Sequence, residues 1–164
     1  ETIAAGQTTE EATEALYGLI PTPSGKRVGC YVASICQRAG RIDARAGFGI
    51  FWGRNNAHNI GRRISGQQND ARAILMGLLG ALSDVPQEHR VDIYTTSKYA
   101  IRSLCYRAGA NYTRGWDCAN GDLLENLAHI IRRRTGQITF YLTEKPDKNE
   151  SQASARGLAL AAIS

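Results

Sequence analysis

The sequence RAGFGIFWG at residues 45–53 has the alternation of a β-strand. Phe48, Ile50 and Trp52 occupy every second position and alternate with Gly47, Gly49 and Phe51. Side chains of a strand point alternately to its two faces, and aromatic and β-branched residues favour this conformation. The segment therefore predicts a strand with one apolar face.

Similar patterns on both sides of this segment predict a sheet with helices around it. Residues 27–32 and 58–65 also alternate and are joined to it by short turns, which indicates an antiparallel meander of three strands. The later apolar patterns predict helices at 71–82, 97–107, 123–131 and 151–163 and strands at 91–94 and 138–142, with 109–120 irregular. This order predicts an α/β domain with a five-stranded mixed sheet, three strands antiparallel and the others parallel, flanked by helices on both faces.

Residues 1–25 differ from the rest of the chain and are interpreted as a leader, with the domain at 26–164. Thr8 and Glu11 have the spacing of a capping box, and the apolar residues that follow have helical spacing up to Pro21. We therefore predict a short amphipathic helix that is a linker or docks on a partner. Its candidate interaction residues are Leu16, Tyr17, Leu19 and Ile20.

Charge and cysteine content restrict the class of protein. The formal net charge of +5 and the pI of about 9.2 allow contact with nucleic acid or with an acidic protein surface. The four cysteines have no CxxC spacing, which argues against a zinc site and favours free thiols in a reducing compartment. Neither a signal peptide nor an apolar run long enough to cross a bilayer is recognised. We expect an intracellular protein, in the cytoplasm or nucleus, that has no contact with a membrane.

The order of elements and several local strings resemble ribonuclease H type 1. The strings are RAGFGIFWG at 45–53, NIG at 59–61, DARAIL at 70–75, IYTTSKY at 93–99, GW at 115–116, NGDL at 120–123 and ARGLA at 155–159. Together they cover about residues 27–162. The resemblance implies the fold of that family and an origin in an enzyme that cuts the RNA strand of RNA–DNA hybrids.

The resemblance also identifies the positions at which the family holds two magnesium ions. Four carboxylates, from the first strand, first helix, fourth strand and last helix, supply the oxygen ligands. Here these positions are Ala33, Ile74, Thr96 and Arg156, and none is acidic. Arginine at one of them would repel a cation. We therefore expect no metal, no cofactor and no nuclease activity.

The residues that contact the hybrid in the family are also changed. Asp70 and Ala71 replace an Asn-Gln pair that reads 2′-hydroxyls, and residues 67–69 replace a phosphate-binding Arg-Gln-Thr segment. The remaining candidates for nucleic-acid binding are Arg45, Arg54, Arg62, Arg63, Asn69, Trp116 and Asn120. The alternative is that the arginines are solvated and Trp116 packs in the core. Arg132, Arg133 and Arg134 end a helix, where positive charge suits the helix dipole.

Three functions remain open from the sequence. The first is a protein–protein assembly module, within a complex related to RNA or nucleic acid, because the core is kept while the catalytic and hybrid-contact residues are lost. The second is a non-catalytic binder of RNA or RNA–DNA hybrid that uses the basic strands. The third, ranked last, is an active nuclease whose metals are held by other acids, for which the candidates are Asp70, Asp92, Glu144, Asp147 and Glu150.

Overall fold

A computed structural model describes residues 26–143, 145 and 148–164, and the predicted leader helix lies outside them. The sheet has the order β3-β2-β1-β4-β5. Its strands are β1 (Arg27–Gln37), β2 (Arg45–Phe51), β3 (Ile60–Arg63), β4 (Arg90–Thr95) and β5 (Ile138–Leu142). β1, β2 and β3 pair antiparallel, whereas β4 lies parallel to β1 and β5 parallel to β4. The predicted mixed sheet and α/β class are confirmed.

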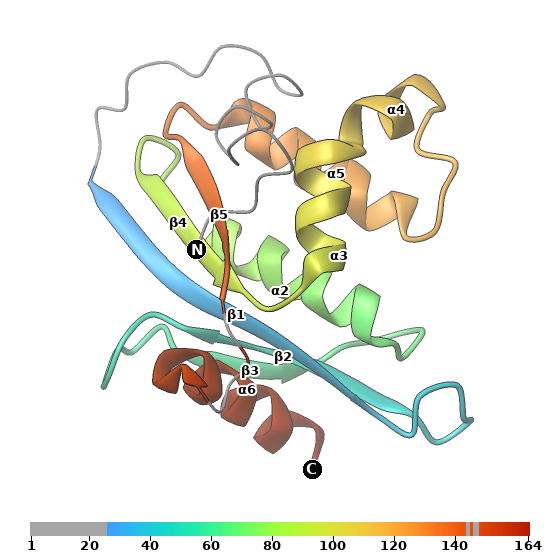
Figure 1. Ribbon diagram of the computed structural model, residues 1–164, viewed down its shortest axis with the longest axis vertical. Helices are drawn as coiled ribbons and strands as arrows, with labels where there is room; N and C mark the ends of the chain where they lie inside the picture. Colours follow the sequence, from blue (N-terminus) through green and yellow to red (C-terminus); the bar gives the residue numbers. More distant parts are fainter. Residues whose placement is uncertain (1–25, 144, 146–147) are drawn as a thin grey trace.

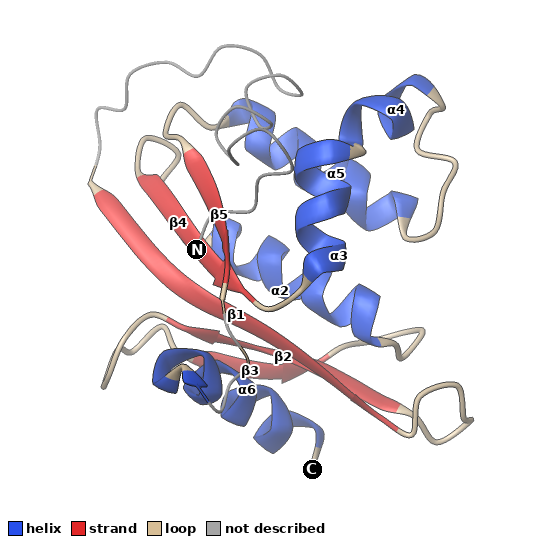
Figure 2. Ribbon diagram, viewed as in Figure 1, coloured by secondary structure: helices blue, strands red, loops and turns tan. Residues whose placement is uncertain are grey.

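Helices cover the two faces of this sheet, as predicted (Figure 1). They are α2 (Asp70–Ser83), α3 (Lys98–Ile101), the π-helix η1 (Arg102–Tyr106), α4 (Ala108–Thr113), α5 (Gly121–Arg133) and α6 (Glu150–Ile163). α6 packs on β1, β2 and β3 from one side. α2 packs on β1 and β2 from the other side, and α5 packs against α2 (Figure 2).

Two local predictions were wrong. Residues 109–120 were predicted to be irregular, but Ala108–Thr113 form α4. Gly109 weakens a helix by only about 1 kcal/mol, and burial of the neighbouring Ala108 favours the helical turn. β3 is also shorter than the predicted 58–65, because the side chain of Asn59 bonds to Trp52 N and Gly53 O and so replaces the ladder there.

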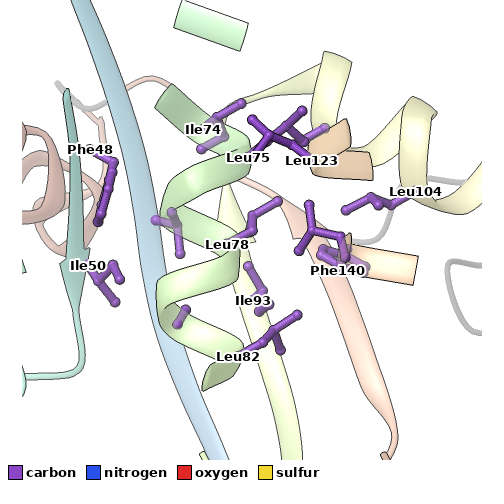
Figure 3. Close-up of a cluster of buried hydrophobic side chains, with 14 of the residues drawn as sticks. Phe48, Ile50, Ile74, Leu75, Leu78, Leu82, Ile93, Leu104, Leu123 and Phe140 are labelled. Atoms are coloured by element: carbon purple, nitrogen blue, oxygen red, sulfur yellow. The ribbon is translucent and has the colours of Figure 1, made fainter. Parts of the chain in front are cut away.

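The core lies between the sheet and α2. Leu75, Leu78 and Leu82 project from α2 towards Ile93 and Phe140 of the parallel strands (Figure 3). Phe48 and Ile50, the apolar face predicted for β2, are buried in the same cluster. The alternation in RAGFGIFWG therefore identified the correct buried face.

The opposite face of β2 is formed by glycines, and this determines where α6 lies. A Cβ atom on Gly49 would overlap the carbonyl oxygen of Ala155, and one on Gly61 of β3 would overlap that of Leu158. The backbone of α6 therefore rests directly on two strands. This contact fixes α6 across the middle of β1 and β2, where it helps to form the candidate site.

All four cysteines are free, as predicted, and Cys30 and Cys105 are buried. Burial raises the pKa of the Cys30 thiol to about 12, so this group remains a neutral core residue at physiological pH. Within the residues that the structure describes, no helix is long and apolar enough to span a membrane.

Candidate functional site

The strand register brings Ala33 and Thr96 to the same level of the sheet. Tyr31 of β1 pairs with Tyr94 of β4 in parallel register, and each candidate residue lies two positions further along its strand. Ala33 pairs with Gly49, so it lies on the face covered by α6. Ala33 is 5% exposed, whereas Thr96, just beyond the end of β4, is exposed.

The first turns of α6 approach the same point of β1. Gln152, which is completely buried, donates from Nε2 to the carbonyl oxygen of Val32 at 3.1 Å. Its Oε1 accepts from the hydroxyl of Thr143, next to the end of β5, at 2.7 Å. Arg156 follows one helical turn later and is exposed. A neutral amide thus joins β1, α6 and β5 beside Ala33.

Ile74, the fourth candidate position, faces the core. Its exposed fraction is 1%, and it belongs to the same hydrophobic cluster as Leu75 and Leu123 (Figure 3). One turn along α2, Gly77 approaches Val32 so closely that a Cβ atom there would be 3.0 Å from Cγ1 of Val32. The four positions therefore lie on elements that meet around β1, and one of them is filled by a core side chain.

No group of three histidine, cysteine, aspartate or glutamate residues that could hold a metal ion occurs in the described part of the chain. Asp92, one acid considered as a substitute ligand, accepts from Nε of Arg27 at 2.7 Å, and this bond raises the pKa of Arg27. Glu150 lies 3.9 Å from Arg54. Glu144 and Asp147 lie outside the described residues. The expectation that no metal binds stays a prediction.

The arginines of the antiparallel strands do not share one face. Arg62 pairs with Phe48 and so lies on the α2 side of the sheet, whereas Arg63 pairs with Gly47 on the α6 side. Arg45 donates to the carbonyl oxygen of Ile163 at 3.4 Å, at the end of α6. Arg62 and Arg63 therefore lie on opposite faces, and Arg45 is bonded to the protein itself. This placement does not support a row of these three arginines along one nucleic-acid backbone.

The polar candidates Asn69 and Asn120 have hydrogen-bond partners within the protein. Asn69 caps α2 by accepting from Arg72 N, and Gln68 joins Ala46 N to Ile64 O. Asn120 donates to the hydroxyl of Tyr99 at 3.0 Å and accepts from Arg72 at 3.3 Å. These bonds fix the start of α2 and the residue before α5.

Arg72 also forms two bonds to the carboxylate of Asp122, at 3.1 and 3.0 Å. This pairing raises the pKa of Arg72 and lowers that of Asp122.

Trp116 is partly buried against the core and meets the ring of Tyr112 edge-on at 6.5 Å between ring centroids. The packing alternative for Trp116 fits this position better than stacking on a base.

Two features of this region were missed in the sequence. One is the Gln152 bridge, whose only signal is a long polar residue one turn before Arg156 in a helix of small residues. The other is a ladder of three tyrosines across β1, β4 and β5: Tyr31 and Tyr94 stack at 4.6 Å between ring centroids, and Tyr94 and Tyr141 at 4.9 Å. Tyr31 and Tyr94 lie two residues before Ala33 and Thr96. The ladder therefore lies directly beside these two positions on the same face of the sheet.

Comparison with known proteins agrees with this architecture. Ribonuclease H1 of Rattus norvegicus is 30% identical over 94 residues, which are 56% of this chain and 31% of that protein. The chain thus matches about a third of the length of this curated relative. No protein-family model matches the sequence.

Solved structures cover more of the chain. LC9-RNase H1, described as a type 1 RNase H with the type 2 active-site motif, has a TM-score of 0.62 at 19% identity, over 88% of this chain and 74% of that one. LC11-RNase H1 in complex with an RNA/DNA hybrid has a TM-score of 0.57 at 20% identity, over 83% and 96%. The chain therefore has an RNase H-like fold and resembles ribonuclease H type 1 in sequence.

Proposed function

We propose that this chain is a non-catalytic RNase H-like domain that serves as a protein-interaction module in a nucleic-acid-related assembly. The observation that carries the proposal is the replacement of all four metal-ligand positions by Ala33, Ile74, Thr96 and Arg156. Two divalent cations need several anionic oxygen ligands. Alanine and isoleucine offer none, threonine offers one neutral oxygen, and arginine adds a positive charge.

The surroundings of these positions support a permanent loss of the chemistry. Ile74 is part of the core, and Gln152 joins α6 to β1 and β5 through neutral hydrogen bonds. In a two-metal site, ions would bridge carboxylates from β1, α2, the end of β4 and α6. Here, core packing at Ile74 and the hydrogen bonds of Gln152 occupy parts of this region, which supports the proposal that no ions bind.

A cleavage assay tests the catalytic part of the proposal. An RNA–DNA hybrid labelled on the RNA strand is incubated with the full chain in Mg²⁺ and, separately, in Mn²⁺, beside an active type 1 RNase H. We expect no product above the metal-free control. Metal-dependent cleavage that co-elutes with the chain on two different chromatographic columns would refute the proposal.

The interaction part needs a separate experiment. Affinity-tagged full chain, expressed at native level in its source cells, is purified under native conditions, and the mass of the recovered complex is measured. We expect a defined complex of fixed stoichiometry, because keeping a fold without its chemistry implies selection on its surface. Recovery of the monomer alone, with and without nuclease treatment of the extract, would count against a protein partner.

Direct binding of RNA or hybrid is the second candidate. The pI of about 9.2 favours it, and the solved structure of LC11-RNase H1 contains an RNA/DNA hybrid. Affinity for hybrid and for double-stranded RNA should then fall steeply as salt rises, because bound cations are released from the phosphates.

Alanine variants of the two neighbouring arginines locate such a surface. Arg62 and Arg63 lie on opposite faces of the sheet, so a nucleic acid bound to one face depends on one of them more than on the other. If Arg62→Ala and Arg63→Ala leave the affinity unchanged, separately and together, the basic strands are not the binding surface.

A further inference from the structure

A groove follows the contact between α2 and α5. Two adjoining cavities of about 480 and 300 Å³ form it, and both are lined by Ile130 and Arg133. Leu79 and Leu82 of α2 form the other side of its floor. Leu79 and Ile130 are only partly buried, so apolar surface remains accessible there.

The polar rim of the groove is basic. His129 and Arg133 line it and are exposed, Arg134 lines its inner end, and none of its lining residues is acidic. An apolar floor with a basic rim fits an amphipathic helix with an acidic polar face. The required ligand is therefore acidic on one side and carries apolar residues at spacings of three and four.

The leader of this chain has that chemistry. Residues 1–25 contain four glutamates and no lysine or arginine, and the apolar residues Ala12, Ala15, Leu16 and Leu19 have helical spacing. The described part of the chain also begins at a place from which the leader could reach the groove. The carbonyl oxygen of Lys26 accepts from Arg90 N at 2.8 Å.

That point lies close to the inner end of the groove. Gln87, which lines the groove, is three residues before Arg90, and its carbonyl oxygen accepts from Gly136 N just beyond α5. Residues 21–25 would span up to about 17 Å when extended. A tethered segment is present at an effective concentration on the order of millimolar, so modest contacts suffice to hold it.

We propose that residues 8–20 dock in the α2/α5 groove of their own chain, with Leu16 and Leu19 against Leu79 and Ile130 and the glutamates towards Arg133. The proposal does not depend on the proposed function, since it concerns the face of α2 and α5 away from the sheet.

Photocrosslinking in the full 164-residue chain tests the contact. Benzoylphenylalanine replaces Asn126, an exposed residue of the groove rim, and the links are mapped by peptide mass spectrometry. We expect a link to residues 8–20 within one chain, and its loss in the Leu16→Asp/Leu19→Asp variant. The same probe at Ile42, a fully exposed residue in the β1–β2 turn, should not link to the leader.

Two charge reversals separate docking from general attraction. Arg133→Glu should lower the yield about two- to fivefold, the range for exposed ion pairs. Arg132→Glu makes the same change in net charge next to the groove, at a residue that lies over the ring of Tyr112, and should leave the yield unchanged. Absence of a link to residues 8–20, equal effects of the two reversals, or links confined to covalent dimers would overturn docking in cis.

Discussion

Ile74 shows how one residue removes a ligand and extends the core at the same time. At 1% exposure it contributes a whole aliphatic side chain to the cluster around Leu75 and Leu123. Thr96, at another of the four positions, is exposed. The same chemical change, from a neutral residue to a carboxylate, should therefore have very different costs at the two positions.

We expect Ile74→Glu to lower the free energy of unfolding by about 4 kcal/mol or more at neutral pH, because burying a carboxylate without a partner is costly. Burial would raise the pKa of this glutamate in the folded state above its unfolded value. The folded state then binds more protons, so the deficit should grow as the pH rises from about 4 to about 7.

Thr96→Asp is the matched control, with an expected change within about 0.5 kcal/mol. Urea unfolding followed by circular dichroism at two pH values measures both variants. Equal stability of Ile74→Glu and the wild type would show that position 74 is open to solvent.

At the scale of elements, α6 is positioned by the absence of side chains on β2 and β3. We expect Gly49→Ala to destabilise the protein by about 3 kcal/mol, since the added Cβ atom meets helix backbone and neither element can move without disturbing the sheet. Gly157, within α6, has nothing within 4 Å of an added Cβ atom. Gly157→Ala should therefore stabilise the protein by about 0.5–1 kcal/mol through helix propensity.

Chemical denaturation of the two variants gives the comparison directly. The opposite signs of the two effects distinguish close packing of α6 from a general preference for alanine over glycine. If Gly49→Ala unfolds at the wild-type midpoint, α6 does not rest on the strand as described.

Arg134 joins the end of α5 to the end of α2. Its guanidinium donates to the carbonyl oxygens of Leu82, Val85, Pro86 and His89, at 2.9–3.4 Å. The residue is buried, and burial lowers its pKa. The sequence favoured a role at the dipole of its own helix, but the bonds are made to the carbonyl end of α2 and the loop beyond it.

Arg134→Met keeps the length of the side chain and removes these donors. We expect a loss of about 3 kcal/mol in the free energy of unfolding, because several buried carbonyl groups lose a charged partner. Arg133→Met, at the exposed neighbour, should change it by less than about 0.5 kcal/mol. Thermal unfolding of both variants measures these changes. Similar unfolding midpoints for the two variants would contradict a stabilising role of the Arg134 hydrogen bonds.

For the molecule as a whole, the sequence predicted what depends on periodicity and could not predict what depends on contacts between distant residues. Alternation in β2 and helical spacing in α2 gave the sheet, its helices and the buried face, because these patterns are local. The positions of Ala33 and Thr96 followed from the resemblance, and each lies two residues beyond the paired Tyr31 and Tyr94.

The side-chain bonds of the site were beyond reach from the sequence. Gln152 and Val32 are 120 residues apart, and the assignment of Asn69 and Asn120 to nucleic acid did not anticipate their bonds within the protein. Arginines adjacent in sequence, such as Arg62 and Arg63, suggested one basic surface, but a strand turns neighbours to opposite faces. Charge along the chain is therefore a poor guide to charge on one face of a sheet.

The loss of the metal ligands predicts that the stability of the whole domain is independent of Mg²⁺. A ligand that binds only the folded state stabilises it, and a site with a Kd of about 1 mM would contribute about 1.4 kcal/mol at about 10 mM Mg²⁺. For a domain of this size, that gain raises the midpoint of thermal unfolding by about 3–6 °C. We expect no such rise for the wild-type chain when samples with Mg²⁺ and with KCl are compared at equal ionic strength, whereas an active type 1 RNase H measured in parallel should show it. Because the comparison holds screening constant, a rise in this chain would mean that acids outside the four positions, such as Glu144 or Asp147, hold a cation, and the non-catalytic assignment would have to be withdrawn.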